Sequence, residues 1–248
     1  AGEPVAPLSD GAGEPAAVEP VGEPESSLSP ADQAKSLAHL FDHRTYNPYC
    51  KVCVRGKAQR RPHRKGKLAL GPAPVHFGDQ VTGDSLIARS GDTDGDEFFP
   101  GATNAFVMYD RATQWVECHP KATLSYEDTL QSMRNFQGTD GRRVKRFYAD
   151  NFASIAKAAK TMRWTTPAST PGISQTNGLA ERKIRQVKEG GRTNLVQSGL
   201  DYAWWPYAVT HHCFAWNTGI ANGDSSYNRR HGQGHCTAKR VPFGALVD

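Results

Sequence analysis

The chain lacks any apolar run long enough to form a transmembrane helix, and its first residues show no basic segment followed by an apolar centre. A membrane span, a secretory signal and a membrane partner are therefore not expected. The sequence also lacks an initiating Met, and we interpret it as a fragment of a longer polypeptide. Cysteine is scarce, because only five residues are present and only Cys50 and Cys53 lie close together. This spacing argues against a secreted disulfide framework and favours a reducing intracellular setting.

Basic residues are absent from residues 1–34, a segment that holds seven acidic residues and is rich in Pro, Gly, Ala and Ser. Such a composition buries too little apolar surface to offset its conformational entropy, so residues 1–34 are predicted to form a disordered linker. The rest of the chain holds all 30 Lys and Arg residues against 18 of the 25 acidic residues. This excess is typical of a protein that binds a polyanion, although an ordinary soluble basic surface would have the same composition.

An alternation of strand and helix patterns begins near Val75. Strands are predicted at residues 81–88, 105–109, 114–118, 144–149 and 163–165, and helices at 123–137, 153–162, 176–198 and 202–216, with a short helix upstream at 31–41. This order predicts an α/β fold in which a mixed five-stranded sheet is flanked by helices. We assign residues 75–200 to the core of this fold and residues 201–248 to a helical extension.

Two His and two Cys residues lie in a short unit that precedes the core, at residues 35–67. His39 and His43 are four residues apart, so on a helix both imidazoles would face the same side. Cys50 and Cys53 form a Cys-x-x-Cys turn that brings two thiolates to one point. This donor set predicts a zinc ion in a tetrahedral shell, which would replace the hydrophobic core that so short a unit lacks. In the alternative, only the cysteines pair and the histidines lie on the surface.

Three acidic residues fall on elements that could bring their carboxylates together. Asp84 is in the middle of the first predicted strand, where an acid is costly unless it has a partner or a metal. Asp150 follows the fourth predicted strand, and Glu181 lies in the first turns of the long helix after it. Hard divalent cations such as Mg²⁺ or Mn²⁺ take carboxylate oxygens as ligands, and a pair of such ions supports phosphodiester chemistry. The pattern therefore predicts Asp84, Asp150 and Glu181 as catalytic metal ligands.

Basic side chains accompany these carboxylates, some on the face of Glu181 along its helix and others in the connector after the Cys pair. A basic stripe that leads away from a metal site suits the phosphate backbone of DNA. The residues predicted to contact DNA are Asn177, Arg185, Lys188, Arg192, Arg60 and Arg61. The alternatives are ordinary solvated charge, which we prefer for Arg182, Lys183 and Glu189, and helix capping for Asn177.

The segment 171–183, Pro-Gly-Ile-Ser-Gln-Thr-Asn-Gly-Leu-Ala-Glu-Arg-Lys, resembles the helix motif that carries the glutamate of retroviral and retrotransposon integrases. Residues 147–151 and 81–84 resemble the two aspartate segments of that family, and the His and Cys cluster resembles its N-terminal zinc motif. Residues 204–209 and 241–247 are similar to the stretch that follows the catalytic core in copia-type elements.

This resemblance covers residues 37–248 and implies an RNase H-like core. Its implied activity is the processing of DNA 3′ ends and their transfer into target DNA, with Mg²⁺ or Mn²⁺ held by Asp84, Asp150 and Glu181. It further implies a zinc ion in the upstream unit, the element's DNA ends and target DNA as partners, and a homo-oligomer. A small-molecule substrate is not expected, and the implied location is the nucleus or a cytoplasmic particle.

Three features depart from the family pattern. The interval between His43 and Cys50 is far shorter than in retroviral integrases, and that between Asp150 and Glu181 is somewhat shorter. Phe152 stands beside the expected metal site, where the family often has a small residue. The sequence therefore leaves open a second hypothesis, a catalytically decayed nucleic-acid-binding remnant of a retroelement polyprotein. A third hypothesis is a nuclease of the RNase H type, against which the upstream zinc cluster argues.

Overall fold

The computed structural model describes residues 28–57, 73–88, 101–139, 141, 143–150, 152–166 and 177–246. The predicted linker at residues 1–34 falls mostly outside these ranges, as do Arg60 and Arg61 of the basic connector. Asn177 is described as the first residue of a helix, but its side chain is not.

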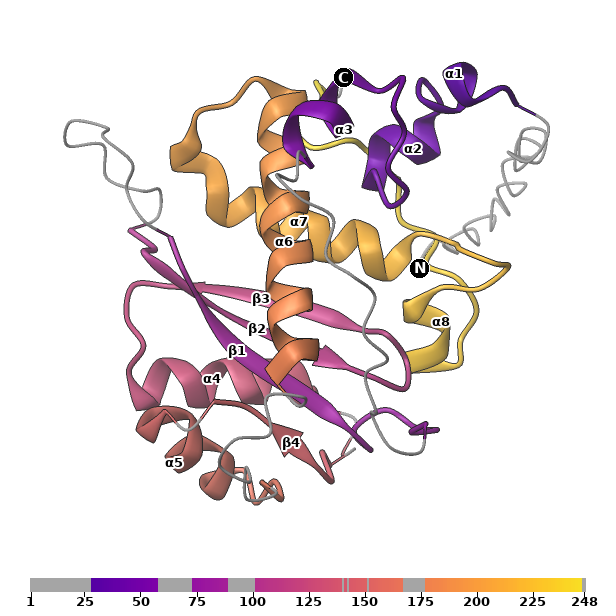
Figure 1. Ribbon diagram of the computed structural model, residues 1–248. Coiled ribbons are helices and arrows are strands. Elements are labelled where there is room, and N and C mark those ends of the chain that lie inside the picture. Colours follow the sequence, from indigo (N-terminus) through magenta and orange to yellow (C-terminus); the bar gives the residue numbers. More distant parts are fainter. Residues whose placement is uncertain are drawn as a thin grey trace, which may run out of the picture.

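A mixed sheet forms the centre of the molecule (Figure 1). Its strands are β1 (Val81–Ile87), β2 (Asn104–Asp110), β3 (Val116–Lys121) and β4 (Phe147–Tyr148). Their order across the sheet is β3-β2-β1-β4, in which β2 is antiparallel to both β1 and β3, and β4 is parallel to β1. The predicted α/β class is thus confirmed, and the strand predicted to contain Asp84 is one of the two central strands.

The predicted strand count was wrong, because the described sheet has four strands rather than five. The expected fifth strand at 163–165 forms a single parallel bridge between Thr165 and Arg146, next to a hydrogen bond from the Phe147 N–H to the Thr165 carbonyl (2.9 Å). Arg163 has a left-handed backbone with φ of 55°, so extended structure cannot begin before Trp164. Pro167 then follows in the sequence and has no N–H to donate, which leaves too short a stretch for a strand.

Helices cover both faces of the sheet (Figure 1). One face is covered by α4 (Tyr126–Gln137) and α5 (Ala153–Thr161), and the other by α6 (Asn177–Ser198) and α7 (Trp205–Thr218), which follows the short 3₁₀ helix η2 (Tyr202–Trp204). Within the described ranges, no helix has both the length and the apolar character that crossing a membrane requires.

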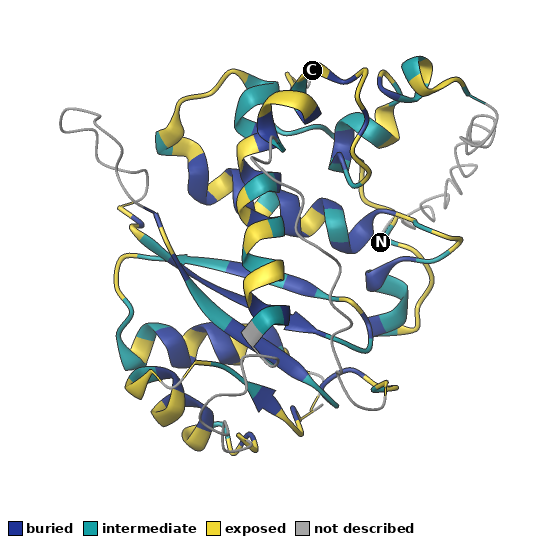
Figure 2. Ribbon diagram, in the orientation of Figure 1, coloured by how far each residue is buried: buried dark blue, intermediate teal, exposed yellow. Residues whose placement is uncertain are grey.

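Strand β2 supplies side chains to both hydrophobic layers, because successive residues of a strand point to opposite faces. Phe106 and Met108 belong to the buried cluster beneath α4 and α5, whereas Val107 and Tyr109 belong to the cluster beneath α6 and α7. Figure 2 shows the resulting dark buried strands between partly exposed helices. Trp205 of α7 lies in the same buried cluster as Val107, so the helical extension completes the core.

Helices α6 and α7 approach each other most closely at a pair of glycines. A Cβ atom added to Gly190 would lie 2.1 Å from Nδ1 of His212, and one added to Gly191 would lie 2.5 Å from Cγ1 of Val209. Any side chain at Gly190 would therefore overlap a buried imidazole. The closeness of this crossing fixes where α6, the helix of Glu181, lies relative to the sheet.

The upstream unit contains three short helices, α1 (Pro30–Gln33), α2 (Leu37–Asp42) and α3 (Lys51–Gly56). The single helix predicted over residues 31–41 is thus divided, because the Ser36 hydroxyl accepts the backbone N–H of His39 and starts a new helix. Helix α3 was not predicted, since its six residues are too few to show a periodic pattern.

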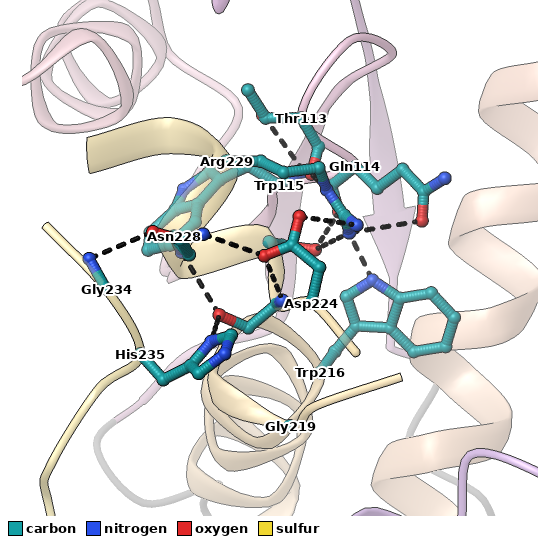
Figure 3. Close-up of polar contacts among 12 residues, drawn as sticks. Thr113, Gln114, Trp115, Trp216, Gly219, Asp224, Asn228, Arg229, Gly234 and His235 are labelled. Carbon is teal, nitrogen blue, oxygen red and sulfur yellow. Dashed lines mark hydrogen bonds and ion pairs between the residues drawn. The ribbon is translucent and has the colours of Figure 1, made fainter. Parts of the chain in front are cut away.

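A last short helix, α8 (Ser226–His231), is hydrogen bonded to the turn between β2 and β3. Figure 3 shows Arg229 of α8 donating to the Thr113 carbonyl (3.0 Å) and pairing with Asp224 (3.5 Å). The indole N–H of Trp216 donates to the carbonyl of Gln114, whose backbone is left-handed with φ of 61°. The unusual turn conformation is thereby held by α7 and α8.

The neighbouring Arg230 is buried, although the sequence marks it as an ordinary basic residue. Its guanidinium pairs with Glu117 (3.1 Å), donates to the Phe136 carbonyl (2.7 Å) and lies 4.1 Å over the ring of Phe77. Burial alone would raise the pKa of Glu117, but its hydrogen bond and charge interaction with His119, the Trp115 N–H and Arg230 together hold that pKa below its ordinary value. The guanidinium of Arg230 therefore joins α8 to β3 through Glu117 and to α4 through the Phe136 carbonyl.

We expect Arg230→Met to lower the free energy of unfolding by about 3 kcal/mol, because it removes the buried guanidinium from the half-buried Glu117 and from the Phe136 carbonyl. Arg229→Met is the matched control, since Arg229 is more exposed on the same helix, and it should cost about 1 kcal/mol or less. Urea unfolding followed by circular dichroism measures both. Equal losses for the two variants would show that the buried contacts of Arg230 add nothing.

Candidate metal centre and carboxylate site

The four predicted zinc ligands come together in the upstream unit. His39 lies on α2, His43 follows it as the left-handed C-cap with φ of 44°, Cys50 is the N-cap of α3, and Cys53 lies in the first turn of α3. Their ligand atoms all lie within 4.8 Å of one another. Among the described residues this is the only group of three or more such side chains close enough to share an ion.

The spacing of the four ligand atoms fits a tetrahedral zinc ion. With Zn–N bonds of about 2.05 Å and Zn–S bonds of about 2.3 Å, tetrahedral angles give N···N edges of about 3.4 Å and N···S edges of about 3.6 Å. His43 Nδ1 lies 3.2 Å from His39 Nε2, and the two histidines lie 3.5 Å from Cys53 Sγ. Cys50 Sγ lies 3.7 Å from His43 Nδ1. The residues present therefore fit this metal in both chemistry and distance.

Burial of this cluster changes the pKa values of its side chains in a way that favours binding of a cation. It lowers the pKa of His43 to about 4, so the imidazole is neutral and can offer a lone pair. It raises the pKa of the Cys53 thiol, because an unpaired thiolate is unfavourable away from water. A divalent cation would supply the positive charge that two buried thiolates need. All five cysteines of the chain are free thiols, so the alternative of a Cys50–Cys53 pair does not arise.

Asp84 lies on β1, and Asp150 follows β4, the strand that pairs in parallel with β1. Thr82 of β1 is opposite Tyr148 of β4, and each aspartate follows its strand's member of this pair by two residues. Asp150 therefore lies just beyond the paired residues of β4, next to the strand that carries Asp84. Asp84 is half-buried and its Oδ1 accepts the backbone N–H of Ser85 (2.7 Å), whereas Asp150 is exposed beyond the end of β4.

Glu181 lies near the start of α6, the helix that crosses β1 (Figure 1). Burial raises the pKa of Asp84 most strongly, and the negative charges of Asp150 and Glu181 raise it further. The N–H of Ser85 and the charge of Lys188 act in the opposite direction. Asp150 and Glu181 thus each lie within electrostatic reach of Asp84, although the three carboxylates are not gathered as closely as the His and Cys cluster. A divalent cation placed among them would relieve this repulsion.

The predicted stripe on α6 is exposed along its whole length. Glu181, Arg185, Lys188 and Arg192 are all exposed, as their helical spacing predicted. Lys188 and Arg192 also line a cavity of about 570 Å³ that begins at Ser85, next to Asp84. The cavity floor is apolar and is formed by residues of β1, α6 and α7, namely Leu86, Ala88, Leu195, Trp205 and Val209.

Lys183 was wrongly predicted to be an ordinary solvated charge. Its ammonium lies 4.1 Å from the ring centre of Tyr109 and 5.0 Å from that of Trp216, and it donates to Gln186 (3.0 Å). Burial lowers its pKa to about 8. The basic pattern of α6 gave no sign of this, because Tyr109 and Trp216 come from distant parts of the sequence.

Phe152, the departure beside the second aspartate, does not fill the carboxylate site. Its side chain is 53% exposed, and it serves as the N-cap residue of α5 with a backbone bond from its N–H to the Asp150 carbonyl (2.7 Å). A bulky residue at this position is therefore compatible with the placement of Asp84 and Asp150.

No protein-family model matches the chain. Over 107 residues it is 27% identical to the Retrovirus-related Pol polyprotein from transposon RE1 of Arabidopsis thaliana. The chain is thus similar to a segment of a retrotransposon Pol polyprotein. The alignment covers 41% of this chain and 7% of that polyprotein, so the chain spans only a small part of this relative's length.

Two solved structures similar to this chain are integrase catalytic cores. The HTLV-2 integrase core, in complex with magnesium and in a trimeric form, matches with a TM-score of 0.47 at 13% identity, covering 63% of this chain and 99% of that one. The core domain of BIV integrase matches with a TM-score of 0.43 at 16% identity, covering 61% of this chain and 92% of that one.

Proposed function

We propose that the chain is the integrase part of a retrotransposon polyprotein and that it processes DNA 3′ ends and joins them to target DNA. The observation that supports this proposal is that Asp84 of β1 lies within electrostatic reach of Asp150, which follows the parallel strand β4, and of Glu181 on α6. An isolated acid in a strand would be weak support, but three carboxylates that converge from three elements suit divalent metal ions.

In this proposal the chain's own residues position the reacting groups. Asp84, Asp150 and Glu181 hold Mg²⁺ or Mn²⁺, which would activate the attacking oxygen and stabilise the leaving oxygen of a phosphodiester. The exposed cations Arg185, Lys188 and Arg192 hold the DNA backbone along α6. Asn177, Arg60 and Arg61 are proposed further contacts at the start of α6 and in the connector.

The partners that follow from this function are the element's DNA ends, target DNA and further copies of the chain. No membrane or small-molecule substrate is proposed, and the chain would act in the nucleus or in a cytoplasmic particle. We retain the proposed division into a linker at 1–34, a zinc unit at 35–67, a core at 75–200 and an extension at 201–248.

A joining assay with purified protein and duplex DNA tests the function. We expect end joining only with Mg²⁺ or Mn²⁺, and a rate about 1,000-fold lower in Asp84→Asn, which corresponds to about 4 kcal/mol of lost metal-assisted stabilisation. DNA binding by the variant should persist, because the basic stripe is unchanged. Asp128→Asn, at an acid on α4 away from the site, is the control and should join ends at the normal rate.

Three outcomes separate the hypotheses. Binding without joining or nicking in either metal would rule out the integrase activity and support a decayed nucleic-acid-binding remnant. Cleavage of RNA–DNA hybrids without end joining would support a nuclease of the RNase H type. Unreduced joining by Asp84→Asn would show that the carboxylate assignment is wrong.

A further inference from the structure

His43 is placed to bind a metal with one ring nitrogen and the core with the other. Its Nδ1 faces the remaining three ligand atoms, whereas its Nε2 is hydrogen bonded to Oε1 of Gln197. A metal on Nδ1 requires the ring proton to be on Nε2, so Nε2–H donates to the amide oxygen. Gln197 belongs to α6, the helix that carries Glu181 near its other end.

The helix that carries Cys53 also lies directly on α6. A Cβ atom added to Gly56 of α3 would lie 2.6 Å from Oγ1 and 2.9 Å from Cα of Thr193. Thr193 lies four residues before Gln197 and therefore on the same side of α6. The ammonium of Lys57, just after α3, donates to the carbonyl of His43 and ties the two halves of the His and Cys cluster together.

Two further contacts hold the upstream unit against α7. Phe41 is buried and packs edge-on against His211 at 5.8 Å and Phe214 at 6.2 Å between ring centres. The guanidinium of Arg44 lies 4.4 Å over the ring of Trp216 and donates to the carbonyls of Trp216 and Gly219. The unit is thus packed on the core at several points and is not held by its connector alone.

We propose that Gln197 is a positioning residue of the zinc centre, and that zinc binding is coupled to the stability of α6. The hydrogen bond from Nε2–H to Gln197 fixes the tautomer and orientation that His43 needs as a ligand. Coupling free energies are reciprocal, so if Gln197 strengthens zinc binding, bound zinc stabilises the position of Gln197 on α6 by the same free energy. About sixteen residues, or about 24 Å of helix, separate Gln197 from Glu181, so zinc would steady the helix of the carboxylate site from its far end.

Zinc affinity, measured by competition with a chromogenic chelator, tests the positioning role. We expect Gln197→Leu to bind zinc about 10-fold or more weakly. Gln197→Glu keeps an oxygen acceptor and should restore the affinity. Gln186→Leu removes an amide elsewhere on α6 and should change nothing. The absorption spectrum of the cobalt-loaded proteins should be altered in Gln197→Leu alone, which a merely structural role for Gln197 would not produce.

Hydrogen exchange of the unmodified chain tests the coupling without any substitution. Removal of zinc by a chelator should speed amide exchange in residues 193–198 of α6, while α4 on the opposite face should be unaffected. Unchanged zinc affinity in Gln197→Leu, or unchanged exchange in α6, would overturn the proposal. Neither measurement involves DNA or end joining, so this proposal and the integrase function can fail independently.

Discussion

Replacing Gly190 with valine is expected to yield a chain that does not fold. Even a single Cβ atom at this position would lie 2.1 Å from Nδ1 and 2.2 Å from Cγ of His212, and this imidazole is itself buried against α6. Gly190→Ala is therefore expected to cost about 3 kcal/mol or more, since neither helix can move without opening the core. The free energy of unfolding of an ordinary domain is about 5–15 kcal/mol. The larger valine side chain is therefore expected to destabilise the fold by more than its total stability.

The direction of the stability change in Gly190→Ala distinguishes between helix propensity and close packing. Helix propensity alone predicts that Gly190→Ala stabilises α6 by about 1 kcal/mol, so crowding by His212 must reverse the sign. Thermal and urea unfolding of Gly190→Ala measure the result. The double variant with His212→Ala, which removes the ring, should be more stable than Gly190→Ala alone. Stabilisation by the single substitution would show that α6 and α7 are not packed this closely.

Replacing Cys53 with serine is expected to abolish zinc binding and to unfold the upstream unit. Cys53 is fully buried at the centre of the His and Cys cluster, and the hydrophobic core of this unit contains few other residues. Zinc binding by small zinc units is worth about 10–16 kcal/mol at neutral pH, which exceeds any stabilisation that such a core supplies. Zinc content by mass spectrometry and the melting temperature measure the loss.

Cys236→Ser is the matched control for this substitution. Cys236 is only half-buried and lies outside the cluster, so its loss should leave the zinc content and the melting temperature unchanged. Full zinc content in Cys53→Ser would show that the four ligand atoms gather for another reason. Equal losses in both variants would indicate a general effect of removing a thiol.

Short-range patterns were sufficient to predict most of the elements and the grouping of the two His and two Cys side chains. The Cys-x-x-Cys spacing and the four-residue spacing of His39 and His43 are local, so their convergence follows from a few turns of chain. The sequence pattern of residues 81–88, which predicted that Asp84 lies on a strand, is likewise local. Even here the capping hydroxyl of Ser36 broke an expected helix, because capping competes with periodicity and a pattern count does not weigh it.

Contacts between distant segments were not predictable from one sequence. Arg230 is buried because Glu117, Phe136 and Phe77 surround it, and nothing near it in the sequence indicates these partners. The same holds for Gln197, whose position on α6 gave no sign of a contact with His43. The metal-binding roles of Asp84, Asp150 and Glu181 stay predictions that the joining assay tests, supported by the electrostatic reach of the other two carboxylates to Asp84.

Strand β1 remains paired with β2 up to its last residue. Ile87 is opposite Asn104, and the N–H of Ala88 donates to the carbonyl of Thr103 (3.0 Å). The chain therefore leaves and re-enters the sheet at adjacent points, whatever the length of the segment between them. Closing a loop costs only about 0.6 kcal/mol more for each doubling of its length. Residues added or removed between Ala88 and Thr103, or a reporter inserted there, should therefore leave Asp84 in place.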